Sequence, residues 1–442
     1  MRRVWLLGLV CAGCAARRWA AEPSDVSDAL QARVGVGLRP EDEGPAELPP
    51  GVDLEDGLSP EEAVSIALWN NADLAVTLTA LGSSRADLVA AGTLSNPTVS
   101  GLIPIGPRQW QAAVSLPLEG LWLRPLRVAE ARAANDVTRL AVLQTALDLV
   151  ADVQRGVLQA SAARARREPA RTLDRLEAAR ADRIALQVEV GDIPPQLADD
   201  ALQRHLAALQ LADASERDAT TTQVDLGRLT GLHDLDQVAM PTLDELVPDA
   251  EPPDADALLR LTLAERPEVQ AAQRALEQAE ASRRLAHLRV LTATLGLHDQ
   301  GGGTSTSKGL GLTPSLTLPL LDWNQAGIAR AEAGLTQARA RLYAVQTRLG
   351  FDVEAAVAEL VDARAALDHL QTVGAPATER NARRIELAVT VGDTSDLELL
   401  QARADTARLQ LATIDARARL GAAWIALERA VGCAVLRGEE PG

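Results

Sequence analysis

One short sequence pattern occurs twice in this chain of 442 residues, and the repetition limits the possible folds more than any other feature. Residues 188–203 read VEVGDIPPQLADDALQ, and residues 389–405 read VTVGDTSDLELLQARAD. In each copy, a helical pattern ends at a Gly-Asp pair and a second amphipathic segment follows. This is typical of a helix that stops at glycine and of a partner helix that returns.

A second pair of segments supports an internal duplication. SLPL at 115–118 and TLPL at 317–320 are 202 positions apart, and the glycines of the two Gly-Asp pairs are 201 positions apart. Similar offsets in unrelated segments indicate a repeated structural unit. The sequence therefore predicts a first repeat over residues 59–253, a second over 254–432, and a C-terminal tail over 433–442.

Each repeat is predicted to contain a helix, a β-hairpin, a long helix, a glycine turn and a returning helix. The hairpin regions, about 97–118 and 291–320, alternate apolar and polar residues, as strands with two different faces do. The other expected landmarks are the turns at 190–195 and 391–396 and the strand-to-helix bends at Pro117 and Pro319.

The helices have recognisable ends. The first begins at Ser59, where a capping serine, a proline and two acids form a favourable helix start, and it is expected to continue to Asn96. The long helix of the first repeat is predicted from Pro125 to Val190, with a bend at Pro169.

The final helix carries a regular apolar stripe whose members are three and four residues apart. This period of 3.5 is typical of a coiled-coil seam packed against a neighbouring helix. The members are Leu397, Leu400, Ala404, Ala407, Leu411, Ile414, Ala418, Gly421 and Ile425.

Composition narrows the class of protein. Aromatic residues make up only 2% of a chain that is 47% hydrophobic, which favours long helices packed by alanine and leucine. The net charge of −17 argues against a nucleic-acid partner. The histidines lack metal-ligand spacing, GGGTSTSKG lies between strands, and no nucleophile-and-base group stands out. We therefore expect no enzyme activity, cofactor or metal site.

The N-terminus has the layout of a secretory signal, predicted over residues 1–13. Ala12-Gly13-Cys14 resembles the end of a bacterial lipobox, which implies cleavage before Cys14 and a lipid on its thiol. Cys11 stands where that motif prefers leucine, and plain secretion is the alternative. Residues 14–58 are rich in Pro, Asp and Glu and are expected to form an extended tether.

The two hairpins present a problem of closure. Their strands have about the length that a tilted strand needs to cross a bilayer, and no later segment is apolar enough for a spanning helix. An open sheet of four strands would leave backbone groups without partners in lipid. Closure takes at least about eight strands, so copies of the chain are expected to complete a cylinder.

The order of elements and several segments resemble the TolC-type outer-membrane efflux proteins. The segments are LSPEEAVSIALWNNADL, SNPTVS and VSLPLEGLWLRPLRVAEARA in the first repeat, and ERPEVQAAQRALEQAEA, LTLPLLDWNQAGIARAEAGLTQARARL and VTVGDTSDLELLQARADTARLQLA in the second. The resemblance covers residues 59–432. The Asn96-Pro97 pair and the lipobox-like start are similar to the CzcC-like branch, which is associated with heavy-metal efflux.

The resemblance implies a mainly α fold with a small membrane β part, assembled as a homotrimer. Twelve strands would form a barrel in outer-membrane lipid, and the long helices would form an α-helical barrel in the periplasm. The partners implied are a periplasmic adaptor (membrane fusion) protein and an inner-membrane pump of the RND type. The chain would act as the passive exit duct of this system.

The resemblance also places both glycine turns at the periplasmic tip, where family members close the tunnel and dock the adaptor. A ring of carboxylates there would favour cations and slow anions. The alternative is that the acids only cap helix starts, as Asp396 before LELLQA would. The matching positions are Glu189, Gly191, Asp192, Gly392, Asp393, Asp396, Glu398 and Gln401.

Two other functions stay open at this stage. The same fold could be a conduit for polypeptides in type I secretion. A non-channel periplasmic coiled-coil adaptor or scaffold would share the helices but lack membrane strands. Two features depart from the family pattern: few ring-bearing residues lie near strand ends (Trp110, Trp122 and Trp323), and Pro194-Pro195 stiffens the first turn.

Overall fold

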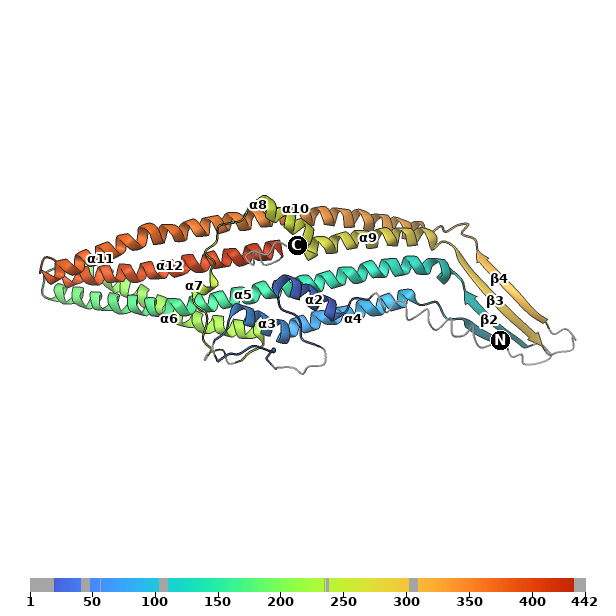
Figure 1. The fold of residues 1–442 in the computed structure, drawn as a ribbon, viewed down its shortest axis with the longest axis horizontal. Coiled ribbons are helices and arrows are strands. Elements are labelled where there is room, and N and C mark those ends of the chain that lie inside the picture. Colours follow the sequence, from blue (N-terminus) through green and yellow to red (C-terminus); the bar gives the residue numbers. More distant parts are fainter. Residues whose placement is uncertain are drawn as a thin grey trace. The chain divides into compact units, whose positions relative to one another are not determined.

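The computed structural model describes residues 20–40, 48–55, 57–102, 110–233, 235, 238–301 and 309–432. The described chain is mostly helical with one small antiparallel sheet, as the sequence predicted (Figure 1). The predictions that lie outside the described residues are the signal peptide, the lipidation of Cys14, the C-terminal tail and the loops of both hairpins.

The elements follow an order that occurs twice: short helices, a hairpin, a long helix and a returning helix. Helix α2 (Pro23–Val34) precedes the first series, which is α3 (Pro60–Asn70), α4 (Ala72–Gly92), β1 (Thr98–Leu102), β2 (Trp110–Pro117), α5 (Glu119–Glu189) and α6 (Gln196–Thr230). After α7 (Leu243–Leu246), the second series is α8 (Ala255–Glu265), α9 (Pro267–Leu288), β3 (Thr292–Gly301), β4 (Gly309–Thr317), α10 (Gln325–His369), the π-helical segment η2 (Leu370–Gly374), α11 (Ala375–Thr390) and α12 (Asp396–Val431).

The helix predicted to begin at Ser59 is two helices, α3 and α4, because the helical conformation is interrupted at Asn71. The start is as expected: Ser59 Oγ accepts from the N–H of Glu62, whose carboxylate accepts from the N–H of Ser59 at 2.9 Å. At the break, the Asn71 side chain donates to the carbonyl of Leu229 and accepts from the N–H of Leu74. One side chain thus caps the start of α4 and connects the break to α6, which stabilises it.

The N-terminal tether is not extended throughout, which corrects the prediction for residues 14–58. Helix α2 forms within it, and Val26 and Leu30, one turn apart, are fully buried. Just before the helix, the N–H of Ala21 donates to Oδ1 of buried Asn135 in α5 at 2.9 Å. The acid and proline content favoured disorder, but this burial offsets the entropic cost of ordering the segment.

Helix α5 contains 71 residues, which correspond to a rise of about 105 Å. It begins at Glu119, six residues before the predicted start at Pro125, and continues through Pro169. A proline removes only one backbone hydrogen bond from a helix that keeps many others. Among the described residues, no single helix is long and apolar enough to cross a membrane; the bent pair α3–α4 passes that test only jointly, by length and composition.

The chain forms two compact units, and each takes segments from both halves of the sequence. Unit 1 comprises Met1–Val26, Val76–Gln144 and Ala264–Arg348, and it contains the sheet. Unit 2 comprises Ser27–Ala75, Thr145–Leu263 and Leu349–Gly442, and it contains both glycine turns. The two halves therefore pack against each other within each unit, while the repeat boundaries at 253 and 254 remain a prediction about the sequence.

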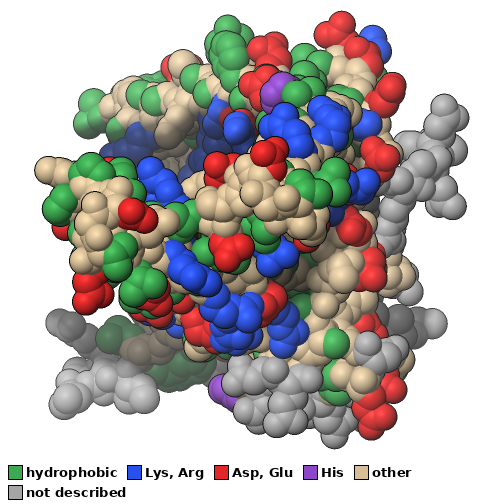
Figure 2. Space-filling view, turned by 90° about the vertical axis from the view of Figure 1, so that its left-hand side faces the viewer, with side chains coloured by type: hydrophobic (Ala, Val, Ile, Leu, Met, Phe, Trp, Pro, Cys, Tyr) green, Lys and Arg blue, Asp and Glu red, His purple; other side chains and the backbone are tan. Residues whose placement is uncertain are grey.

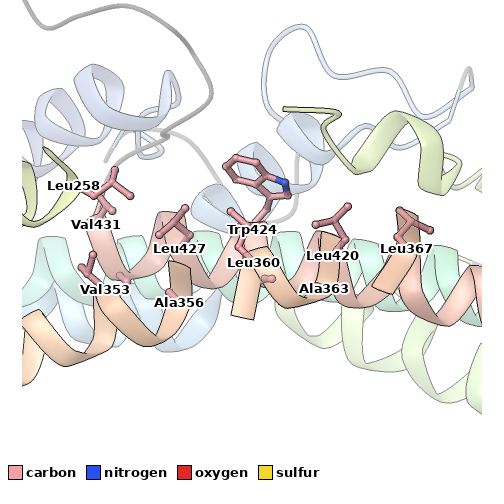
Figure 3. Close-up of a cluster of buried hydrophobic side chains, with 12 residues drawn as sticks. Leu258, Val353, Ala356, Leu360, Ala363, Leu367, Leu420, Trp424, Leu427 and Val431 are labelled. Atoms are coloured by element: carbon pink, nitrogen blue, oxygen red, sulfur yellow. The ribbon is translucent and has the colours of Figure 1, made fainter. Parts of the chain in front are cut away.

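The core of unit 2 follows helix α12. One of its faces packs on α10, where Leu420, Trp424 and Leu427 meet Val353 and Leu360 (Figure 3). The sequence predicted only the stripe of period 3.5 on this helix, and this second apolar face was not predicted.

The predicted seam of α12 is a packed interface with α5. Its described contacts fall into two clusters, one of which also includes Ala208 of α6. The seam residues in them are Ala404, Ala407, Leu411, Ile414, Ala418 and Ile425, and the α5 residues are Leu158, Ala162, Ala170 and Leu173. The small side chains allow the two helices to approach closely.

Candidate functional site

The four strands form one antiparallel sheet in the order β1-β2-β3-β4. The two hairpins join through β2 and β3, which pair from Trp110 opposite Gly301 to Pro117 opposite Thr294. Among the described strands, β1 and β4 each have a single neighbour and are therefore the edges of the sheet.

The register brings the apolar stripes of all four strands onto the same face. Val114 of β2 lies opposite Val99 of β1 and Leu297 of β3, and Leu297 lies opposite Leu312 of β4. This face is not covered by the rest of the chain, since Val99 is 77% exposed and Leu312 is 66% exposed. A continuous apolar patch of this kind requires lipid or another protein surface.

The opposite face of the sheet is polar. Thr98 Oγ1 and Ser115 Oγ lie 2.6 Å apart across β1 and β2. Farther along, Thr313 Oγ1 lies 3.1 Å from Nδ1 of His298 across β4 and β3. Side chains that hydrogen-bond to one another and to water suit an aqueous surface, so the two faces have opposite solvent preferences.

The two glycine turns have the same hydrogen-bond geometry. Gly191 and Gly392 adopt left-handed backbone angles, with φ of 80° and 77°. The N–H of Asp192 donates to the carbonyl of Gln187, and that of Asp393 to the carbonyl of Ala388, each at 2.9 Å. Each glycine N–H also donates to the carbonyl three residues before it, at 3.0 and 3.1 Å, and the two bonds together form the Schellman motif that ends a helix.

The predicted acids of these turns are exposed, and most of them stand apart. Glu189, Asp192, Asp393 and Glu398 all lie on the surface, and Asp396 is 3.8 Å from the guanidinium of Arg183 in α5. Figure 2, which views the molecule from the side where the turns lie, shows acidic, basic and hydrophobic side chains interspersed.

The helix start after Gly392 differs from the expected capping arrangement. Ser395 occupies the N-cap and Asp396 the first helical position, so Asp396 favours the helix through its charge and is not the capping residue. Gln401 lies within α12 and donates to Oδ1 of Asp405 at 2.8 Å, while its own Oε1 is buried and has no hydrogen-bond partner among the described residues.

A network of charges behind the turns connects α5 to α12. Glu177 of α5 has a side chain that is only 1% exposed, and it pairs with Arg408 of α12 and, at 3.4 Å, with Arg180. Arg408 also pairs with Asp405 at 2.7 Å, which continues the network to Gln401. A buried carboxylate is costly without its partners, so this pairing favours the observed arrangement of the two helices.

Sequence reasoning missed this network, although one signal was available. Leu173, Glu177 and Ile184 follow each other at spacings of four and seven, on a face of α5 where Leu173 and Ile184 are buried. A glutamate in a stripe of apolar residues needs a charged partner. The partner, Arg408, is 231 positions away and cannot be identified from spacing.

At two other helix contacts, an arginine lowers the pKa of the glutamate with which it pairs. The hydrogen bond from Arg167 lowers the pKa of Glu216 below its ordinary value, and Arg171 adds to the effect. The hydrogen bond from Arg419 likewise lowers the pKa of Glu359. These pairs connect α5 with α6 and α10 with α12, respectively.

The remaining predicted positions are structural landmarks. Pro117 is the last residue of β2, two residues before α5 begins, and Pro319 lies between β4 and α10. In the part of the chain that the structure describes, no group of three or more His, Cys, Asp or Glu side chains could hold a metal ion.

Comparison with known proteins gives the same fold. The chain is similar to a membrane protein from Pseudomonas aeruginosa (19% identity, TM-score 0.68, 89% of this chain and 98% of that one). It is also similar to the outer membrane protein VceC from Vibrio cholerae (14%, 0.67, 85% and 96%) and to the Campylobacter jejuni CmeC outer membrane channel (13%, 0.67, 91% and 92%). No curated protein sequence matches significantly.

A helical protein with a four-stranded amphipathic sheet and this topology has the fold of the TolC-like outer-membrane channels, which confirms the resemblance stated from the sequence. A family match covers less than half of the chain and lies in its second half. Residues 258–433 match the family described as "Outer membrane efflux protein". This match and the fold shared with outer-membrane channels agree with each other.

Proposed function

We propose that this protein is the outer-membrane channel of a tripartite efflux system and the passive exit duct for its cargo. The observation that supports this most strongly is the sheet, with one exposed apolar face and one polar face. An apolar face toward lipid and a polar face toward water are the requirements of a strand wall around an aqueous passage.

The edges of the sheet favour a trimer. Strands β1 and β4 would each leave backbone N–H and C=O groups without partners in lipid, at a cost of several kcal/mol per group. Three copies joined edge to edge would give a barrel of twelve strands, in which every edge is paired. Two copies would give eight strands, whose side chains would fill the interior.

The two turns and the charges behind them would form the closed end of the duct. Asp192, Asp393 and Asp396 are exposed carboxylates, and three copies would place them in a ring that favours cations. Glu177 and Arg408 would hold α12 against α5 in the closed state. The same surface would dock a periplasmic adaptor, which connects the duct to an inner-membrane pump, for which we propose the RND type.

Conductance in planar bilayers tests both parts of this proposal. The purified protein should form pores, and reversing the charge with Asp393→Lys and Asp396→Lys should reduce cation preference, measured as a shift in reversal potential. Glu168→Lys, an exposed charge reversal on α5 away from the turns, is the matched control. Absence of conductance under all conditions would contradict the proposal that the protein forms a channel. An unchanged reversal potential would contradict the proposal that a ring of carboxylates selects cations.

The lipid anchor at Cys14 and the CzcC-like, heavy-metal branch stay predictions. Mass spectrometry of the mature N-terminus tests the first, and metal sensitivity of a deletion strain tests the second. The same strain distinguishes small-solute efflux from polypeptide secretion, which the fold serves equally well. The scaffold alternative offers no reason for an exposed apolar sheet face.

A further inference from the structure

A groove runs along helix α9 in unit 1, where the helices meet the sheet. It consists of two adjoining cavities of about 620 and 540 Å³, which share Glu130, Gln278, Leu285 and Arg289 in their walls. Helices α4, α5, α9 and α10 line it, and Thr292, the first residue of β3, lies at its sheet end. The proposed efflux function assigns no role to this groove.

The groove exists because its floor is built of very small side chains. They recur at intervals of three, four or seven residues along α9 and α10, so each helix presents them on one face. At Gly334 an added Cβ would have no atom within 4 Å, which shows how open the floor is. The small residues are Ala275, Ala279, Ala286, Gly327, Ala331, Gly334 and Ala338.

Arginines line the walls of the groove. Arg127, Arg289, Arg330 and Arg341 contribute to its lining, against the two acids Glu119 and Glu130. None of the four arginines forms an ion pair with another residue among those described, although the chain has 61 acids and 44 basic residues. The groove is therefore locally cationic in an acidic protein.

Two polar atoms in the smaller cavity are left without partners. Nε of Arg127 and Oε2 of Glu119 are both buried, and neither has a hydrogen-bond partner in the described structure. Both residues line the cavity that also includes Arg289. Buried polar atoms without partners are costly. An anionic oxygen would accept from Nε of Arg127, whereas Oε2 of Glu119 is itself an acceptor and needs a donor such as a ligand hydroxyl.

We propose that this groove binds an amphiphilic organic anion. A phosphate or carboxylate would lie between Arg289 and Arg127, which line the same cavity and whose paired N–H donors match its planar or tetrahedral oxygens. A short apolar body would lie on the alanine and glycine floor beside Leu285. The ligand could be a phospholipid at the membrane boundary, since the groove begins where the strands end, or a soluble anion of the same chemistry. Binding does not require the channel to conduct, so this inference stands apart from the proposed function.

Binding of octyl phosphate to the purified full-length protein in a non-ionic detergent tests the proposal. Calorimetry should show binding of octyl phosphate and much weaker binding of octanol, which lacks the anion. Arg289→Gln and Arg127→Gln, which alter the cavity that both residues line, should each weaken binding about tenfold, because each removes charge-assisted hydrogen bonds. The matched controls are Arg283→Gln on α9 and Arg339→Gln on α10, which remove the same charge from positions outside the groove lining.

A second arm identifies the source of the ligand. Protein reconstituted with mixed phosphatidylglycerol and phosphatidylcholine is purified, and the retained lipid is measured by mass spectrometry. Loss of retained phosphatidylglycerol in the groove variants indicates a lipid ligand; unchanged lipid with weakened octyl phosphate binding indicates a soluble one. If groove and control variants behave alike in both arms, or if octanol binds as well as octyl phosphate, the proposal is overturned.

Discussion

At the scale of single residues, Glu177 is the most informative side chain in the protein. It occupies a position of α5 where neighbouring members of the same face are apolar, and its side chain is 1% exposed. A carboxylate in such a place is stable only because Arg408 and Arg180 neutralise it. Its partners lie on two different helices, so it connects the arrangement of α5 to that of α12.

Replacement of Glu177 by Gln should destabilise unit 2. The change leaves Arg408 without its buried partner, and because Arg408 is itself 41% exposed, water offsets part of the loss. We expect the free energy of unfolding to fall by about 1–3 kcal/mol. Thermal unfolding followed by circular dichroism measures it.

Glu168→Gln is the matched control for this substitution. Glu168 is on the same helix and pairs with Arg175, but its side chain is 71% exposed. Its loss should change stability by less than about 0.5 kcal/mol. Equal effects at the two positions would show that burial of Glu177 has no energetic consequence.

The Glu216 pair should make stability depend on pH. Its pKa is lower in the folded protein than the ordinary value of 4.5, so its contribution is complete above about pH 4.5 and is lost as the pH falls through the folded pKa. The melting temperatures of the native protein and of Glu216→Gln should therefore differ most near neutral pH and converge in acid. A difference that stays constant across this pH range contradicts the assignment.

At the scale of elements, the close packing of α12 against Leu158 of α5 and against Val247 depends on Gly421. An added Cβ would lie 2.9 Å from Cδ1 of Leu158 and from Cγ2 of Val247, which is too close for a real contact. Gly421→Ala should therefore cost about 1–3 kcal/mol of unfolding free energy, despite the better helix propensity of alanine. Gly82→Ala, in α4 with no atom within 4 Å of the added Cβ, is the control and should be neutral or stabilising.

The two turns should respond to substitution through the backbone alone. No atom of the described residues lies within 4 Å of a Cβ added at Gly191 or Gly392, so alanine meets no clash with them. Gly392→Ala should still cost about 1 kcal/mol because of the left-handed backbone, and Gly392→Asn should cost less. Hydrogen exchange of the Asp393 amide, which bonds to Ala388, would report the loosening, and equal exchange in all three proteins would contradict it.

The elements that the sequence predicted well are those with strong local signals. Alternation located the four strands, and the paired glycines located both turns, because these patterns depend on neighbouring residues alone. The break at Asn71 and the ordering of α2 were missed, since both depend on distant partners, Leu229 and Asn135. The start of α5 was placed too late because proline was given too much weight.

At the scale of the whole molecule, the sequence predicted a duplication but not how the halves combine. The pairing of β2 with β3 merges the hairpins into one sheet, and it puts all the apolar stripes on one face. The charged network could not be predicted from the sequence either, because Glu177 and Arg408 belong to different halves of the chain. Sites built within one segment could be predicted, whereas those built between the halves required coordinates.

The central claim is that one copy leaves its sheet open and that two further copies complete it. Native mass spectrometry of the full-length protein, extracted from membranes in a mild detergent, tests this most directly. The account predicts a particle of three chains that keeps this mass on dilution. A particle of one chain, or of two, would contradict it.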